Sequence, residues 1–588
     1  MSQFHFHEQE TSLLHGGQKP DPTTGARAVP IYQTTAYVFP DTKHAQDVFG
    51  LKKGGNIYSR IGNPTVDAFE QRIALLEDGT AAVATSSGMA AITLTILNIA
   101  GAGDEIIADA NLYGGTYNLF ANTLPKYGIH VTFVDGTDPA AIKTAITDRT
   151  KAIYGEIITN PSLNVFDVES VAEVAHENDI PLIIDNTFAT PYVTKPLQWG
   201  ADIVVHSATK WIGGHGTVVG GVVVDGGRFN WGNGKFPEFT EPDESYNGLR
   251  YIDVSPAAFA TKLRVQLIRD IGACLDANSA FLLLQGLETL HLRIERHNQN
   301  AQEVAHFLHD HPAVEWVNYP GLSDHPSHAL ARKYFQDQFG SVITFGIKGD
   351  RHAGKQVIDQ VTLWSHVANV GDAKSLIIHP ASTTHQQLSA EELEKSGVSE
   401  ELIRLSVGLE ATKDLLHDLD LAISKGVGSQ SIHQPSNEDT IKWLLTSPFD
   451  RNEEAIRQKT VALIGPENPE DDFYKQALKL EQLGYRIVPV TGKQSTSQEG
   501  TYQTLKDIPF DVDAVWVKDD GAITSEITEQ LINKQINILW IEHAADSNPT
   551  LENTKAAGIT VIANQNPYVA YTALRENKPL NVKVETYA

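Results

Sequence analysis

ADIVVHSATKWIGGHG, residues 201–216, joins an apolar run to small hydroxyl side chains, a lysine and a glycine-rich turn. The run IVV at 203–205 is typical of a buried strand bounded by turn signals. Ser207, Thr209 and Lys210 do not suit a hydrophobic core, so we expect them at the carboxyl end of this strand. That edge is where open α/β sheets bind ligands. Taken alone, Lys210 fits an ordinary exposed charge better than a site residue, because most lysines are exposed.

Short apolar runs alternate with amphipathic segments from residue 81 onward, which predicts βαβ units and a mostly parallel sheet. The strands expected there are DEIIADA, HVTFVDG, TKAIYGEI, IPLIIDN and ADIVVHS. A helical region at about 257–311 follows, and GSVITFGIKG, SLIIHPAS and ELIRLSVGLE indicate the strands of a smaller α/β domain. The predicted fold class is therefore α/β.

Asp185 ends the apolar run IPLIIDN, 25 residues before Lys210. One crossover between two parallel strands would bring both side chains to the same sheet edge. An aspartate at a strand end is often only a turn or helix cap. Paired with a lysine it suggests a pyridoxal phosphate site, in which the lysine forms a Schiff base and the carboxylate keeps the pyridine nitrogen protonated.

The cofactor also needs a phosphate site, and ATSSGMAAITLTIL offers one. Ser86, Ser87, Gly88 and Met89 open a predicted helix whose first N–H groups and positive dipole end favour an anion. Serine and glycine also begin helices for capping alone, so a purely structural role stays open.

Five ordered motifs resemble the Cys/Met metabolism family of pyridoxal phosphate enzymes, of fold type I, over residues 13–423. The motifs are YSRIGNPT, SSGMAA, DNTFATPY, HSATKWIGGHG and RLSVGLE. The resemblance implies a large, mostly parallel sheet domain with a small α/β domain. It makes Lys210 the Schiff-base lysine, Asp185 the partner of the ring nitrogen, and Tyr113 a ring-stacking and proton-carrying residue.

The resemblance also assigns the remaining site residues. Arg404 would bind the substrate α-carboxylate. Tyr58 and Arg60 would reach the cofactor phosphate of a neighbouring subunit, which implies a homo-oligomer with shared active sites, commonly a dimer of dimers. The other cofactor contacts are Gly88, Met89, Thr187, Ser207 and Thr209, and the other substrate contacts are Asn160 and Ser375.

Two segments, GKFPEFTEPDESYNGLRY and HPASTTHQQLSAEEL, resemble the O-acetylhomoserine sulfhydrylases within this family. These enzymes make homocysteine from O-acetyl-L-homoserine and sulfide. A γ-lyase and a cystathionine γ-synthase remain alternatives, because they share the same cofactor residues. Gly115 stands where methionine γ-lyases typically carry a cysteine. The sequence gives no physical role for GKFPEFTEP.

Composition limits the function classes. The 588 residues carry a net charge of −27, which disfavours nonspecific binding to nucleic acid or anionic membranes. A single cysteine permits no intrachain disulfide and no cysteine-cluster metal site, and we expect no metal. The amino terminus shows no signal peptide and no run is long enough to span a membrane, which favours a cytoplasmic location.

A separate carboxyl-terminal domain is expected. We divide the chain into 1–425 (arm to about 65, large domain to about 270, small domain to 425), a polar linker at 426–440, and a Rossmann-like domain at 441–588. TVALIG, YRIVPVT, VDAVWV, NILWIE and ITVIAN are its expected strands, and it resembles a CoA-binding domain. The turn at 465–469 departs from G-x-G-x-x-G, so packing or assembly is as reasonable a role as ligand binding.

Overall fold

The chain forms two compact units, Met1–Ser431 and Ile432–Ala588. The computed structural model describes residues 8–246, 248–254, 256–348, 351–383, 399, 401–427, 444–445, 459–465, 472–491, 501–534, 536, 538–544, 548–557, 559–564 and 566–575. The predicted linker at 426–440 lies almost wholly outside the described residues, and so does most of the 465–469 turn. The domain boundaries expected from the sequence stay predictions.

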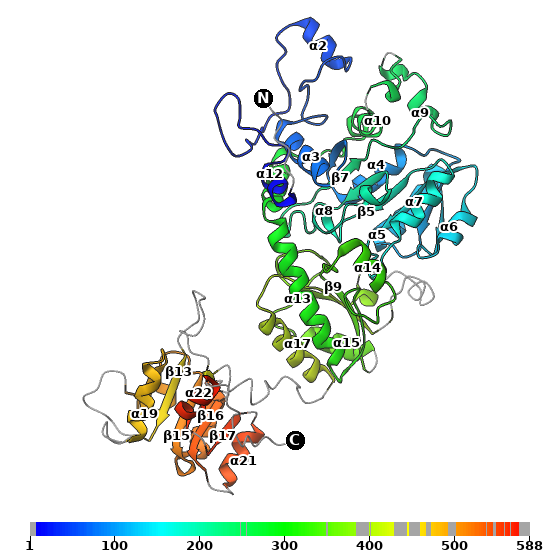
Figure 1. Cartoon of the computed structure of the whole chain (residues 1–588). Coiled ribbons are helices and arrows are strands. Elements are labelled where there is room, and N and C mark those ends of the chain that lie inside the picture. Colours follow the sequence, from blue (N-terminus) through cyan, green and yellow to red (C-terminus); the bar gives the residue numbers. More distant parts are fainter. Residues whose placement is uncertain are drawn as a thin grey trace. The chain divides into compact units, whose positions relative to one another are not determined.

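A seven-stranded sheet forms the centre of the first unit (Figure 1), in the order β1-β7-β6-β5-β4-β2-β3. Strand β7 is antiparallel to both neighbours, and the other pairs are parallel. The strands are β1 (Ala81–Thr85), β2 (Glu105–Asp109), β3 (His130–Val134), β4 (Thr150–Glu156), β5 (Leu182–Asp185), β6 (Ile203–His206) and β7 (Gly221–Asp225).

The five strands expected from the apolar runs are confirmed as β2 to β6. Strands β1 and β7 were not predicted. Strand β7 lies inside HGTVVGGVVVDGG, whose glycines indicated turns, and only its pairing between β1 and β6 makes it a buried central strand.

Helices cover both faces of this sheet. Alternate residues of a strand face opposite sides. Leu182 and Ile184 belong to one hydrophobic cluster with residues of α3, α7, α12 and α13, whereas Ile183 belongs to another with residues of α4 and α10. The helices are α1 (Gln9–His15), α2 (Thr42–Phe49), α3 (Pro64–Leu76), α4 (Gly88–Leu97), α5 (Gly114–Asn118), α6 (Pro139–Ala145), α7 (Val168–Glu177), α8 (Thr190–Val193), α9 (Pro237–Thr240), α10 (Ala258–Lys262), α11 (Arg269–Ile271), α12 (Ala277–Glu288) and α13 (Leu290–Asp310).

A second, five-stranded sheet completes the first unit, in the order β10-β11-β12-β9-β8. Its strands are β8 (Val314–Asn318), β9 (Val342–Ile347), β10 (Ser365–His366), β11 (Leu376–Ile378) and β12 (Leu402–Ser406), and its helices are α14 (His328–Phe335), α15 (Arg351–Gln360) and α17 (Thr412–Val427). The three predicted strands are confirmed as β9, β11 and β12. Strand β12 is fully buried between β9 and β11, which places Arg404 in the interior.

The second unit has an all-parallel sheet in the order β14-β13-β15-β16-β17. Its strands are β13 (Thr460–Ile464), β14 (Arg486–Val490), β15 (Ala514–Asp519), β16 (Ile538–His543) and β17 (Thr560–Ala563), and its helices are α19 (Asp472–Glu481), α20 (Ser525–Asn533), α21 (Pro549–Ala556) and α22 (Pro567–Arg575). All five predicted strands are confirmed. A separate hydrophobic cluster covers each face, as expected for a doubly wound α/β fold.

Among the helices that the structure describes, none combines the length and the apolar composition that crossing a membrane requires.

Candidate active site

Strands β5 and β6 bring Asp185 and the Lys210 segment to one edge of the large sheet. Asp185 pairs with Val205 in a parallel register, and the chain then leaves β6 after His206. The Leu, Ile and Val residues of both strands are fully buried. The buried apolar strands therefore form a rigid base for the site, and the polar residues that follow each strand lie at the carboxyl edge of the sheet.

Lys210 is partly buried and has a polar but uncharged partner. Its Nζ donates a hydrogen bond to Oδ1 of Asn369 at 2.6 Å. Burial, together with the positive charge of Arg404, lowers the pKa of Lys210 to about 8. Among the described residues no carboxylate lies within ion-pair distance of this amine. A lysine with a lowered pKa is a better nucleophile and proton acceptor near neutral pH.

Asp185 is held by its neighbours at the strand edge. Its Oδ1 accepts from the Thr187 N–H at 2.9 Å, and its Oδ2 accepts from Tyr154 Oη at 3.4 Å. The hydroxyl oxygen of Thr187 in turn accepts from the Ser207 N–H at 2.8 Å. Burial raises the pKa of Asp185. Thr187 thus ties the two strand ends together.

The first turn of α4 lies directly against Ser207. A Cβ added at Gly88 would lie 2.6 Å from Cβ and 2.9 Å from Oγ of Ser207. The Ser87 side chain caps the helix by accepting from the Ala90 N–H at 3.1 Å. The first N–H groups of an α-helix have no partner within the helix, so this turn offers donors beside the Ser207 hydroxyl. Thr209 follows, and its hydroxyl exchanges hydrogen bonds with Gly220.

Tyr113 precedes α5 and has a half-exposed ring, with 46% of its surface accessible. Its N–H donates to Oε1 of the buried Glu156 at 2.7 Å. A Cβ at Gly115 would lie 2.5 Å from Cε1 of the Tyr113 ring. Any larger residue at position 115 would therefore collide with the Tyr113 ring, which explains why a glycine stands here.

Arg404 is buried on β12 and bonds only to neutral groups. Its Nη1 donates to Asn160 Oδ1 at 3.0 Å, and its Nη2 donates to the carbonyl of Asn369 at 3.4 Å. Burial lowers its pKa to about 10. No carboxylate among the described residues forms an ion pair with it, so a substrate carboxylate would complete its environment.

Ser375 does not join this group. It is fully buried, its hydroxyl donates to Glu410 Oε2 at 2.8 Å, and its Oγ accepts from the Gly408 N–H at 2.7 Å. Its hydroxyl thus bonds within the small domain, and the substrate contact expected of Ser375 stays a prediction. Asn369 lies beside Arg404 and Lys210 instead.

Tyr58 and Arg60 lie in the amino-terminal arm, apart from this cluster. The Arg60 guanidinium is 5.5 Å from the centre of the Tyr58 ring and donates to the carbonyl of Arg269. Neither forms a hydrogen bond with the residues around Lys210 in the described chain. Their role at a neighbouring subunit's phosphate stays a prediction.

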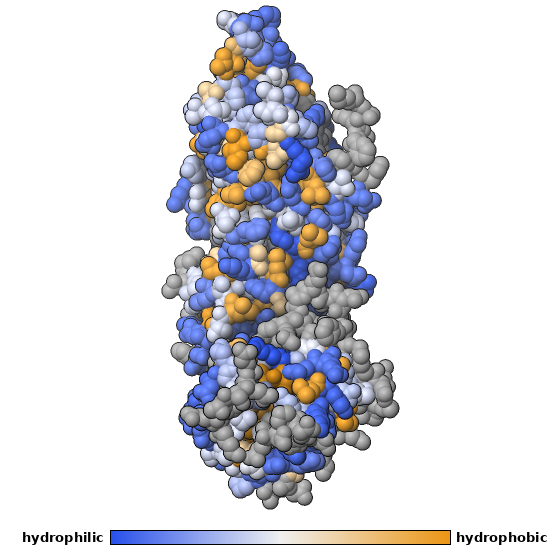
Figure 2. All heavy atoms as spheres, turned by 90° about the vertical axis from the view of Figure 1, so that its left-hand side faces the viewer, coloured by the Kyte–Doolittle hydropathy of each residue, from blue (hydrophilic) through white to orange (hydrophobic). Residues whose placement is uncertain are grey.

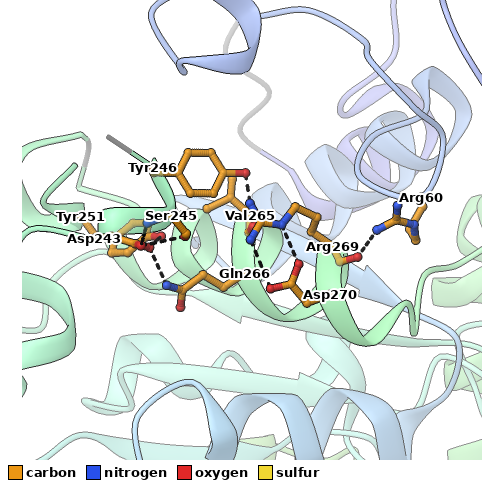
Figure 3. A network of polar contacts seen from close by, with 9 residues as sticks. All are labelled: Arg60, Asp243, Ser245, Tyr246, Tyr251, Val265, Gln266, Arg269 and Asp270. Carbon is orange, nitrogen blue, oxygen red and sulfur yellow. Dashed lines mark hydrogen bonds and ion pairs between the residues drawn. The ribbon is translucent and has the colours of Figure 1, made fainter. Parts of the chain in front are cut away.

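The 234–251 segment forms a polar network next to this arm (Figure 3). Asp243 accepts from Tyr251 Oη at 2.5 Å and from Gln266 Nε2 at 2.6 Å, and these bonds lower its pKa to about 2. The Arg269 guanidinium lies 4.9 Å from the Tyr246 ring. Arg269 also carries the carbonyl that binds Arg60, so the segment packs against the residue that fixes Arg60.

Aromatic packing anchors the same segment. Phe239 stacks on Trp231 with centroids 4.4 Å apart, and Phe236 meets Trp231 edge-on at 5.1 Å. Both phenylalanines are fully buried. Phe236 and Phe239 of GKFPEFTEP, a stretch unexplained in the sequence, therefore attach this segment to the large domain.

Sequence reasoning missed Glu156 and Asn369. Glu156 lies near the end of the predicted strand TKAIYGEI and is the last residue of β4, as Asp185 is of β5, and this position could have revealed it. Asn369 lies in the irregular stretch VANVGDAK, where no local pattern distinguishes it. Among the described residues no group of His, Cys, Asp or Glu could hold a metal ion.

A half-buried lysine and a half-buried aspartate at the carboxyl edge of a mostly parallel sheet, with a helix amino terminus beside them, define a cofactor-dependent α/β enzyme site. Residues 10–424 match the family described as Cys/Met metabolism PLP-dependent enzyme, and the chain belongs to that family. Residues 459–572 match the family described as CoA binding domain.

Characterised relatives narrow the class. The chain is 54% identical over 424 residues to the O-acetyl-L-homoserine sulfhydrylase of Leptospira meyeri, covering 70% of this chain and 96% of the relative. It is 51% identical over 418 residues to the homocysteine synthase of Schizosaccharomyces pombe, covering 70% and 97%.

Solved structures agree with the fold. A Campylobacter jejuni structure described as an O-acetylhomoserine (thiol)-lyase with N'-pyridoxyl-lysine-5'-monophosphate matches with a TM-score of 0.69 and 42% identity, covering 71% of this chain and 100% of the other. Cystathionine γ-lyase from Lactobacillus plantarum matches with a TM-score of 0.62 and 36% identity, covering 71% and 99%. Fold type I, expected from the motifs, is confirmed.

Proposed function

We propose that the first unit is an O-acetyl-L-homoserine sulfhydrylase, which replaces the acetate of O-acetyl-L-homoserine with sulfide and yields L-homocysteine for methionine biosynthesis. The similarity to sulfhydrylases along nearly their whole length carries this proposal. Two features support it: GKFPEFTEPDESYNGLRY resembles the corresponding segment of the sulfhydrylases, and Gly115 stands where methionine γ-lyases typically carry a cysteine.

The residues present fit pyridoxal phosphate. Lys210 offers a buried amine without a carboxylate partner, and Asp185 offers a carboxylate for the pyridine nitrogen. The close approach of Gly88 to Ser207 supports an anion site at the first turn of α4, which also contains Met89. Thr209 follows two residues after Ser207. Bound there, the cofactor supplies an electron sink for negative charge at the substrate α-carbon.

The side chains of this chain divide the remaining work. Arg404 binds the substrate α-carboxylate, with Asn160 and Asn369 holding its guanidinium. The Lys210 amine, with its lowered pKa, removes the α-proton. A second proton then leaves the β-carbon, acetate leaves the γ-carbon, and sulfide adds there. Tyr113 and Lys210 are the groups placed to carry these protons.

Product analysis tests this function. The purified chain is incubated with pyridoxal phosphate and O-acetyl-L-homoserine, with and without sulfide, and homocysteine and 2-oxobutyrate are measured together. Homocysteine that forms only with sulfide supports the sulfhydrylase. Formation of 2-oxobutyrate regardless of sulfide, without homocysteine, would favour a γ-lyase, and cystathionine formed from added cysteine would favour a synthase.

The enzyme acts as a homo-oligomer with shared sites in this proposal. Where Figure 2 displays hydropathy, hydrophilic residues predominate and hydrophobic ones form small groups. The arm is an exception in composition, because Ile31, Val38, Phe49 and Tyr58 are exposed, Val38 by 98%. An apolar arm that also carries Arg60 suits contact with a second copy. Sedimentation of the full chain with and without residues 1–65 measures this directly.

In this proposal the second unit binds CoA or an acyl-CoA. A cytoplasmic location is part of the same proposal and rests on the similarity to sulfhydrylases. The family match at 459–572 supports a nucleotide-type ligand. In a doubly wound sheet such a ligand binds at the carboxyl ends of the strands where the strand order reverses, which here is between β13 and β15. Calorimetry of the full chain with CoA and acetyl-CoA tests it. No heat with either would leave packing or assembly as the role of this unit.

A further inference from the structure

Glu156 occupies a central place among the site residues. It ends β4 and pairs with Asp185 of β5 in a parallel register, so the two carboxyl groups lie on the same face of the sheet edge. Its side chain is buried, with 5% of the residue exposed. A carboxyl group in such a place costs free energy unless its oxygens are bonded.

Two backbone N–H groups face this carboxyl. The Tyr113 N–H donates to Oε1 at 2.7 Å, and the Asn160 N–H also lies against the carboxyl and favours its charged form. Tyr113 precedes α5, whereas Asn160 lies in the loop after β4 and its side chain accepts from Arg404. One side chain thus contacts the backbone of both residues that flank the substrate region.

The charge of Asp185 and the burial of the site both raise the pKa of Glu156. Burial is the main cause that raises the pKa of Glu156, and the neighbouring carboxylate of Asp185 raises it further. Tyr154, also fully buried, fills the space beside them and donates to Asp185. Retaining an acid here is unfavourable for packing alone, which indicates that its acceptor oxygens serve the site.

Resting on the proposed function, we propose that Glu156 is a positioning residue. Its carboxyl oxygens accept hydrogen bonds from the backbone N–H groups of Tyr113 and Asn160. These bonds hold the Tyr113 ring and the Arg404–Asn160 pair so that both face the same substrate.

A matched control lies at the opposite edge of the same sheet. Asp225 ends β7, is buried, and accepts from the Gly227 N–H at 2.8 Å and the Ala260 N–H at 3.0 Å. Burial raises its pKa to about 6. Asp225→Ala therefore removes the same kind of interaction from the same sheet without touching the site.

Steady-state kinetics of the holoenzyme separate positioning from stability. We expect Glu156→Ala to lower kcat/KM for O-acetyl-L-homoserine by about 100-fold, because a shift of about 1 Å in reacting groups has an effect of that order. Glu156→Gln keeps an acceptor oxygen, so we expect kcat/KM within about threefold of the wild type. Asp225→Ala should lower thermal stability and leave kcat and KM of the folded enzyme unchanged.

Hydrogen exchange of the cofactor-free protein gives a readout that does not depend on activity. Amides of the peptide containing Tyr113 should exchange faster in Glu156→Ala than in the wild type, and Glu156→Gln and Asp225→Ala should retain protection there. The exchange measurement does not depend on which substrate the enzyme uses. It can therefore refute the positioning role of Glu156 without refuting the sulfhydrylase activity, and the reverse also holds.

Three results would overturn the inference: a Glu156→Ala enzyme within twofold of the wild type, unchanged exchange at Tyr113, or a Gln variant as impaired as the Ala variant. Should Glu156→Ala not fold, Glu156→Met removes the acceptor while keeping the volume, and the same comparisons apply.

Discussion

Gly88→Ala tests the phosphate site at the start of α4 through a steric contact alone. The added Cβ would lie 2.6 Å from Ser207 Cβ and 2.9 Å from its Cα. Because carbon atoms pack at roughly 3.5–4.0 Å, the first turn of α4 must retreat by about 1 Å. Hydrogen bonds of about 2.9 Å from this turn to an anion would then exceed the usual limit of about 3.2 Å.

The expected loss follows from those bonds. A hydrogen bond to a charged group is worth about 1.5–3 kcal/mol, so losing one or two of them weakens cofactor binding by about 10-fold to more than 1000-fold. Overpacking would lower the free energy of unfolding by about 1–3 kcal/mol in addition.

The assay is the dissociation constant of pyridoxal phosphate for the cofactor-free protein, from fluorescence titration, beside urea unfolding. Gly101→Ala, just beyond α4, is the control, because its Cβ would meet only Asp104 Oδ2 at an ordinary 3.9 Å. If folded Gly88→Ala bound the cofactor within twofold of the wild type, the assignment of the α4 turn to the phosphate would be wrong.

Four further results are expected. Lys210→Ala should abolish both turnover and covalent attachment of pyridoxal phosphate, and retention of either, by mass spectrometry or product analysis, would contradict the role of this lysine. The rate of attachment to the cofactor-free wild type should rise with pH and level off above about 8, since the neutral amine is the reactive form. Arg404→Met removes a positive charge that lowers the pKa of Lys210, so this transition should move to higher pH. The KM for O-acetyl-L-homoserine should also rise by about 100-fold, because the substrate carboxylate loses its partner. An unmoved transition would argue against the electrostatic effect of Arg404 on Lys210. Gly115→Ala should displace the Tyr113 ring and lower kcat by about 10-fold or more with little effect on unfolding, and an unchanged kcat would show that the ring position is not needed.

Most of the strands could be read from the sequence because a buried parallel strand is a continuous apolar run between turn signals. Strand β7 could not, because its own glycines indicate turns and its burial depends on β1 and β6. Strand β1, AAVAT, is too weakly apolar to stand out before its neighbours are known.

Within the site, residues that directly follow a strand were predictable, and residues that arrive from elsewhere were not. Asp185 and Lys210 leave adjacent strands, so their shared edge follows from one crossover. Asn369 meets Lys210 across 159 residues, and no local pattern encodes that meeting. Ser375 shows the converse, because a serine close to Asn369 in the sequence is turned instead towards Glu410.

By itself the sequence determined the α/β class, the apolar strands, the helix start at Ser87 and the chemical types that a pyridoxal phosphate site requires. These depend on neighbours within a few residues, where periodicity and capping act. The tertiary structure alone decided that Glu156 contacts the Tyr113 backbone, that Asn369 lies beside Lys210 and Arg404, and that buried aromatic rings anchor the segment around Phe236 and Phe239. Those contacts join segments far apart in the chain, and their geometry follows from strand order and domain packing.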